Sequence, residues 1–392
     1  MSVIKRISGI LTPPPFRRRE EPDERQQYTD GRYDFANQVR SHLRPLLVTE
    51  AVDAETVSRI ANEIKQLGHE KGLYATAAEI RIQLELMVRR AIEEGTPLYA
   101  DRGYRLAADF IIYQIVKEIE GIRTTGSGLG PHILASYCSD LYACLIDGHD
   151  VRRAIETPVM IAERLLWYAS PNPAQRPAFL AFLDPVLTPA LKLVQQKEEQ
   201  LQQNERQGAL TRRKRDAADS EESQQPTRRR KPEGSGAPAD PWRTSKHLNV
   251  GLAFLRQIQT RCLSLREALL QFEGAGCVTH EDLGRPVEST RLAQHLEYLS
   301  GLQTIAQQKN YAAFLGAVNE ETGLCLLQAN AAQARHAFAA AARCYELQGD
   351  EEAAILLANL AQSRYKRAIQ LYTKAQDMPA AERVASRIEK TR

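Results

Sequence analysis

The sequence predicts an all-α protein in which two helical domains are joined by a disordered basic linker. Apolar residues recur three and four positions apart through about 31–205 and again through about 247–392, which is the spacing of an amphipathic helix. No stretch alternates apolar and polar residues for long enough to indicate a strand. Residues 206–246 separate the two helical regions. They are rich in proline, glycine, serine and glutamine and contain almost no aliphatic residue after Leu210.

Length and charge agree with this division. The chain has 392 residues, 43% of them hydrophobic, which is enough for two or three domains of about 150 residues each. The 52 basic and 49 acidic residues nearly cancel, yet positive charge is concentrated in residues 5–19 and 212–231. We therefore expect any contact with an anionic partner to come from the N-terminal arm and the linker.

The sequence predicts neither a transmembrane span nor a secretory signal peptide. The longest apolar stretch, residues 106–116, contains Asp109 and has about half the length that a bilayer requires. The first eleven residues are interrupted by Lys5 and Arg6 and are followed closely by prolines. The sequence has six cysteines: Cys138, Cys144, Cys262, Cys277, Cys325 and Cys344. None of them forms a CxxC pair, so we expect free thiols and an intracellular location, cytoplasmic or nuclear.

We expect residues 1–30 to form a flexible arm, which is basic before Glu20 and mainly acidic just after it. Three interpretations remain open: a disordered tail, a short helix that docks on a partner or a membrane, and an organelle transit peptide. The docking helix is suggested by apolar residues at helical spacing between Val3 and Leu11. The transit peptide is suggested by the arginines and the absence of acids before Glu20.

The N-terminal helical domain, residues 31–205, contains at least six predicted helices. Most of them are predicted by periodic apolar residues followed by glycine or Asp-Gly, and one of them begins at Pro131. Five of these helices cover about 53–67, 76–91, 101–120, 131–146 and 150–168. Prolines at 171, 173 and 177 then predict a loop, after which a helix restarts near Pro189 and continues to about Gln207. The glycine run 126–130 follows a helix and lacks the Lys-Ser/Thr of a phosphate-binding loop, so we expect an interhelical loop.

The linker, residues 206–246, carries two basic clusters separated by twelve residues. This spacing resembles a bipartite nuclear-import signal, in which an extended chain lets both clusters reach acidic pockets on an import carrier. The same clusters could contact the phosphates of RNA or DNA without reading sequence. A solvated linker, with acids such as Asp216 and Glu221 offsetting the bases, is the third interpretation. The clusters are Arg212, Arg213, Lys214, Arg215, Arg228, Arg229, Arg230 and Lys231.

The C-terminal helical domain, residues 247–392, begins with apolar stripes over 248–269 and 292–305. A third stripe starts at Tyr311 and a fourth at Leu324. The last 60 residues are rich in alanine, which permits close approach between helices.

Within this domain, aromatic and small residues recur at the spacing of a helical hairpin: Phe338, Ala341, Ala342, Tyr345, Gly349, Asp350, Ala354, Ala358 and Ala361. A weaker echo follows at Tyr372, Gln376, Asp377, Ala381 and Ala385. About 55 residues therefore resemble the tetratricopeptide-like helical-hairpin family. Two interpretations remain open: a true repeat array and a helical bundle that uses similar hairpin packing. The echo follows after 27 residues, from Tyr345 to Tyr372, where the family repeat has 34. The resemblance implies tetratricopeptide-like hairpin packing, a turn at Gly349-Asp350 and a groove that binds protein partners without catalysis.

No motif in the sequence predicts catalysis, a cofactor or a metal ion. The chain has no GxSxG, HExxH or paired-cysteine motif, and its eight histidines are scattered. The one Cys/His/acid cluster in the sequence is Cys277, His280, Glu281 and Asp282, which lacks a second cysteine or an evident base. We therefore expect a protein that is not an enzyme.

The leading hypothesis is a scaffold or adaptor that binds protein partners through its helical surfaces. The alternative is a nucleic-acid-binding structural protein of nucleocapsid type, whose basic arm and linker contact phosphates. Homo-oligomerisation is compatible with either hypothesis.

Overall fold

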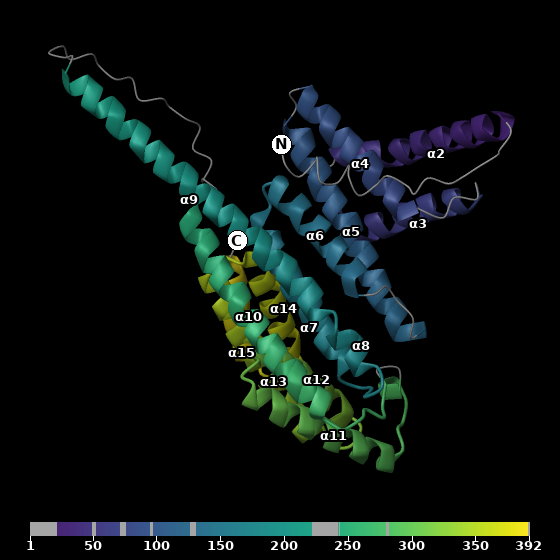
Figure 1. Cartoon of the computed structure of the whole chain (residues 1–392). Coiled ribbons are helices and arrows are strands. Elements are labelled where there is room, and N and C mark those ends of the chain that lie inside the picture. Colours follow the sequence, from purple (N-terminus) through teal and green to yellow (C-terminus); the bar gives the residue numbers. More distant parts are fainter. Residues whose placement is uncertain are drawn as a thin grey trace. The chain divides into compact units, whose positions relative to one another are not determined.

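A computed structural model describes residues 22–48, 52–70, 76–94, 97–125, 131–221, 242, 244–279 and 282–390 (Figure 1). Over these residues the chain is all-α: its regular secondary structure is helical, and it contains no strand. Two compact units divide the chain, Met1–Asp150 and Val151–Arg392. The all-α prediction is therefore confirmed.

In its described residues the first unit contains five helices: α2 (Pro22–Val48), α3 (Ala54–Glu70), α4 (Thr76–Glu93), α5 (Pro97–Thr125) and α6 (Pro131–Asp147). Its core gathers one apolar stripe from each of α2 to α5, with Leu43, Ile64, Leu84 and Leu106 among the buried residues. Helix α2 begins at Pro22, inside the predicted flexible arm, while residues 1–21 and the glycine run 126–130 lie outside the described residues.

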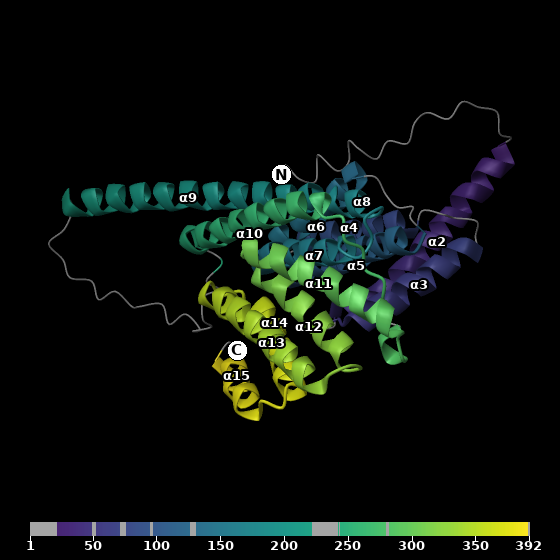
Figure 2. The same ribbon diagram turned by 90° about the horizontal axis from the view of Figure 1, so that it is seen from below.

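The second unit contains the remaining elements: α7 (Val151–Ala169), α8 (Arg176–Leu180), α9 (Leu183–Glu221), α10 (Ser245–Gln271), η2 (Asp282–Gly284), α11 (Ser289–Gln308), α12 (Ala312–Leu326), α13 (Ala331–Ala354), α14 (Ala358–Lys374) and α15 (Met378–Lys390). From α11 onward, successive helices pack on one another and are joined by connections of three or four residues, 309–311, 327–330, 355–357 and 375–377 (Figure 2). Connections this short make neighbouring helices run antiparallel.

The predicted domain boundary differs from the observed division, which falls at Asp150 and Val151. Helices α7 and α9 pack with later helices because side chains distant in sequence pair there. Glu163 accepts two hydrogen bonds from Arg364, at 2.7 and 2.6 Å, and Asp184 accepts one from Arg266 at 2.9 Å. Residues 151–205 therefore belong to the same unit as the C-terminal helices.

The first part of the predicted disordered linker, residues 206–221, is helical in the structure, because α9 continues through Glu221. Residues 195–221 are mainly glutamine, glutamate, arginine and alanine, which are strong helix formers. Side chains four residues apart add hydrogen bonds along the helix, such as Gln195 with Glu199 at 3.0 Å and Gln202 with Glu198. Composition that suggests a solvated linker is thus also compatible with a solvated helix. Most of the remaining linker, 222–241 and 243, lies outside the described residues.

Helix α12 corrects a smaller prediction. The stripe that starts at Tyr311 and the expected new start at Leu324 belong to one continuous helix, Ala312–Leu326. Gly323 does not interrupt it; the glycine instead gives room to the ring of Phe338, which a Cβ there would approach to 2.6 Å.

One helical stretch, Arg176–Thr211, is long and apolar enough by composition to cross a membrane, although 44% of its most apolar window is buried inside the fold. Its apolar residues belong to the core of the second unit: Phe179, Leu180, Phe182, Leu183, Val186, Leu187, Ala190 and Val194. Core helices of soluble proteins have the same composition, so the stretch is weak evidence for a membrane span.

Candidate functional site

The predicted hairpin residues meet at the α13–α14 contact. Phe338, Ala342 and Tyr345 on α13 and Ala361 on α14 are buried in one apolar cluster, which also includes Tyr365 and Tyr372. Small residues at Ala342 and Ala361 let the two helices approach closely, while the aromatic rings fill the remaining space. Ala354, also predicted to contribute, is the last residue of α13 and is exposed.

The predicted turn at Gly349-Asp350 is wrong. Both residues lie inside α13, and the chain turns at 355–357, where Leu356 has a positive φ of 64°. A Cβ on Gly349 would lie 2.7 Å from Cε1 of Tyr365, so this glycine permits a close helix contact. Gln376 and Asp377, which belong to the weaker echo of the pattern, lie between α14 and α15.

Of the two predicted basic clusters, the first lies within the described residues and the second does not. Arg212, Arg213, Lys214 and Arg215 lie on α9, so this cluster is helical and not extended. Arg228, Arg229, Arg230 and Lys231 lie outside the described residues, as do His280 and Glu281. The structure therefore gives no geometry for a joint contact of the two clusters with an import carrier or a phosphate backbone.

A buried ion-pair network joins α7, α13 and α14. The Arg364 guanidinium lies between two carboxylates, 2.6 Å from Glu163 and 3.3 Å from Glu352. The phenol of Tyr311 also donates to Glu163, at 3.2 Å. Burial raises the pKa of Glu352 to about 7, although the nearby Arg364 charge opposes this shift. Glu352 Oε2 is buried and has no hydrogen-bond partner in the described part of the chain.

A second network crosses from α15 to α13. Glu346 and Asp350 lie four residues apart on α13, and Arg383 and Arg387 lie four residues apart on α15. Arg383 contacts Glu346 at 2.9 Å, and Arg387 contacts Asp350 at 2.5 Å. The phenol of Tyr365 on α14 donates a hydrogen bond to Asp350 at 2.8 Å, and the phenol of Tyr372 donates one to Glu346 at 2.7 Å. The matched i, i+4 spacing of acids and arginines was visible in the sequence and could have suggested this pairing.

A groove of about 350 Å³ runs along α14 beside α13 and is lined by Tyr345, Ser363, Arg364, Lys366, Arg367 and Gln370. Two of its arginines form ion pairs with carboxylates of the fold. Arg364 pairs with Glu163 and Glu352, and Arg367 donates from Nε to Glu320 Oε2 at 2.9 Å. Lys366, Ser363 and Gln370 are exposed. The groove thus combines fixed guanidinium groups with exposed hydrogen-bonding side chains.

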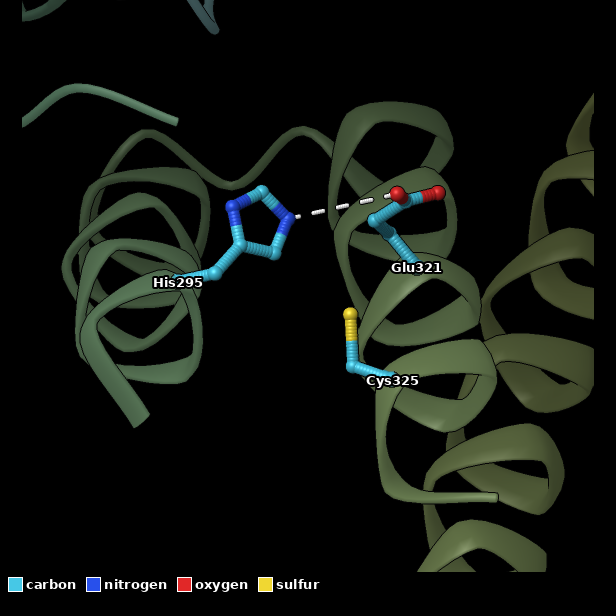
Figure 3. Close-up of side chains that lie close together, drawn as sticks. All are labelled: His295, Glu321 and Cys325. Carbon is cyan, nitrogen blue, oxygen red and sulfur yellow. Dashed lines mark ion pairs between the residues drawn. The ribbon is translucent and has the colours of Figure 1, made fainter. Parts of the chain in front are cut away.

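A third cluster lies between α11 and α12 and consists of His295, Glu321 and Cys325 (Figure 3). One ligand atom of each residue lies within 4.8 Å of the other two, and all three residues are buried. Burial lowers the pKa of His295 to about 4, so its ring is neutral near pH 7, and burial raises the pKa of the Cys325 thiol to about 12. These are side chains that could hold a metal ion.

No family model, curated protein or solved structure matches this chain.

Proposed function

We propose that this protein is a helical adaptor that binds a protein partner in the groove between α13 and α14. The observation that carries the proposal is the lining of the groove, where Ser363, Lys366 and Gln370 offer exposed polar groups beside the fixed guanidinium groups of Arg364 and Arg367. Tyrosine and arginine are the residue types that most often carry binding energy at protein interfaces.

The arginines of the groove favour a rigid binding surface. Arg364 and Arg367 are fixed by Glu163, Glu352 and Glu320, so little side-chain entropy is lost when a partner docks beside them. Their charges are already offset by these carboxylates. Lys366 therefore supplies the least compensated charge in the groove, and we expect the bound segment to place an acidic or hydrogen-bond-accepting group beside it.

The experiment places a photo-crosslinking residue at Ser363 in the full-length protein and irradiates it in cells. We expect one discrete protein adduct, which Lys366→Glu weakens and Lys390→Glu does not. Both lysines are exposed, but Lys390 ends α15 and is not part of the groove lining. A crosslinker at Glu389 is the positional control.

Two results would contradict the adaptor proposal. The first is the same set of adducts from Ser363 and Glu389, which would indicate nonspecific proximity. The second is a high 260/280 nm absorbance ratio in the purified protein that falls steeply as salt is raised. That result would favour nucleic-acid binding through the basic segment of α9 and the residues after it.

A further inference from the structure

Three side chains with donor atoms suited to zinc converge between α11 and α12. Glu321 and Cys325 are four residues apart on α12, which places them on one face of that helix. His295 projects from α11 toward that face (Figure 3). Nitrogen, sulfur and carboxylate oxygen are the donors that a zinc-class cation takes from proteins.

The ring of His295 supplies a second, independent observation. Its Nε2 atom is buried and has no hydrogen-bond partner among the residues that the structure describes, and the side chain is only 3% exposed. The nearest carboxylate oxygen, Glu321 Oε1, is 4.0 Å away, which is too long for a hydrogen bond. A buried polar atom without a partner is uncommon in folded proteins and requires an explanation. A cation held between His295, Glu321 and Cys325 would provide one.

We propose that His295 Nε2, Glu321 and Cys325 Sγ bind one divalent cation of the zinc class. A glutamate carboxylate and a cysteine thiolate carry two negative charges, which the cation neutralises, while the imidazole remains neutral. On binding, the cysteine S–H bond breaks, the sulfur–metal bond forms, and the thiol proton passes to solvent. The thiolate donor favours zinc-class ions over Mg²⁺ and Ca²⁺, which prefer oxygen ligands.

The separation of the donor atoms is compatible with a site that closes around the ion. Bonds of about 2.0–2.3 Å in a tetrahedral zinc site place neighbouring donor atoms roughly 3.5 Å apart. The three donor atoms lie within 4.8 Å of one another, so side-chain rotations that bring them about 1 Å closer would form the site. A solvent molecule would complete the four ligands.

The other ring nitrogen of His295 couples this site to the loop after α10. The backbone N–H of Cys277 donates to Nδ1 at 3.2 Å, so the neutral ring carries its own proton on Nε2. A cation at Nε2 transfers that proton to Nδ1, where it faces a second donor. The Cys277 hydrogen bond must then break, and cation binding should loosen this loop.

The test titrates chelator-treated, full-length protein with Co²⁺, a coloured probe for zinc sites. We expect thiolate-to-cobalt charge-transfer absorption that saturates at one equivalent and is abolished by added Zn²⁺. Cys325→Ser should remove the band, and His295→Gln should weaken binding by at least about tenfold. Cys344→Ser, which replaces a half-buried thiol on α13, should leave the band unchanged.

Hydrogen exchange of the unmodified chain provides a readout that needs no variant. The amide of Cys277 should exchange faster when Zn²⁺ is present, because its hydrogen bond to His295 is lost. Absence of a saturable band in the unmodified protein overturns the proposal, as does an unchanged band in a folded Cys325→Ser variant. If that variant fails to fold, Glu321→Gln replaces it, and unchanged affinity overturns the proposal equally. Slower exchange at Cys277 with Zn²⁺ overturns the coupling to the loop.

Discussion

Glu352 is fully buried beside a guanidinium that it shares with another acid. Its pKa is raised to about 7 chiefly by burial, against an ordinary value of 4.5, so the folded state retains a proton that the unfolded chain releases. Between pH 4.5 and 7 the folded protein binds more protons than the unfolded one, and the free energy of unfolding falls as pH rises. The contribution of Glu352 is complete below pH 4.5 and is lost as pH passes through 7.

The substitution Glu352→Gln should remove this pH dependence. A shift of the Glu352 pKa from 4.5 to about 7 corresponds to at most about 3 kcal/mol. Between pH 4.5 and 8, the free energy of unfolding of the unmodified protein should therefore fall by up to that amount relative to the variant. Urea unfolding at a series of pH values measures the difference. Glu389→Gln, at an exposed position on α15, is the control and should show no such trend. A constant difference between the unmodified protein and Glu352→Gln across this range would contradict the prediction.

Gly349 should tolerate no side chain. Alanine at this position would place Cβ 2.7 Å from Cε1 of Tyr365, and moving the ring would disturb the 2.8 Å hydrogen bond from its phenol to Asp350. We expect Gly349→Ala to lower the free energy of unfolding by about 1–3 kcal/mol, although alanine is the better helix former. Gly208→Ala is the matched control in α9, because no atom of the described residues lies within 4 Å of a Cβ built there, and it should be neutral or stabilising. Equal effects at the two glycines, measured by urea unfolding, would be incompatible with the packing role of Gly349.

At the scale of elements, α9 is a helix whose outer half has few contacts. Residues 203–211 are all exposed. In this stretch Glu205 contacts α10, because it accepts a 2.6 Å hydrogen bond from Ser245 at the start of that helix. Local helix propensity therefore determines the stability of this segment more than tertiary packing does.

Proline at position 208 should break α9 locally without unfolding the core. It removes one backbone donor and clashes with the carbonyl four residues earlier, at a local cost of about 3 kcal/mol. We expect Gly208→Pro to speed amide exchange through about 205–215 while the thermal midpoint of the second unit stays within about 2 °C. A large fall in that midpoint would show that the outer half of α9 supports the core after all.

Two helices of this fold were predicted to within two residues at each end. The pattern for 150–168 corresponds to α7 (Val151–Ala169), and the pattern for 131–146 corresponds to α6 (Pro131–Asp147). Two misreadings have physical causes. Glutamine, glutamate and arginine serve equally in a linker and a solvated helix, so α9 was ended too early. Glycine serves both turns and close contacts, so Gly349 was taken for a turn.

The cation site was hidden for related reasons. Glu321 and Cys325 have the i, i+4 spacing of a shared helix face, but the expected break before Leu324 separates them. His295 lies on another helix, and its approach depends on how α11 packs against α12. Sequence periodicity alone does not specify that tertiary contact. Similarly, no local pattern identifies Glu163 as the partner of Arg364, 201 residues away.

At the scale of the whole molecule, the sequence placed the domain boundary where composition changes, whereas the compact units divide where packing changes. Residues 206–246 are poor in aliphatic residues, yet α7 to α9 share a unit with the helices that follow this segment. The observed division at Asp150 follows Gly148 and His149, a short turn that resembles other interhelical turns in the sequence. The packing of α7 and α9 against α10, and of α7 against α12, accounts for the assignment, and it is known only from the fold.

The two units should unfold as separate cooperative blocks, because each has its own apolar core. Leu84 is fully buried among residues of the first unit, and Leu371 is fully buried among residues of the second. Truncating either to alanine should cost about 2–5 kcal/mol, since it leaves a cavity in that core. Hydrogen exchange followed by mass spectrometry should show faster exchange within 34–147 for Leu84→Ala and within 331–390 for Leu371→Ala. If either variant accelerates exchange equally in both ranges, the chain unfolds as one cooperative block, and the division at Asp150 has no thermodynamic counterpart.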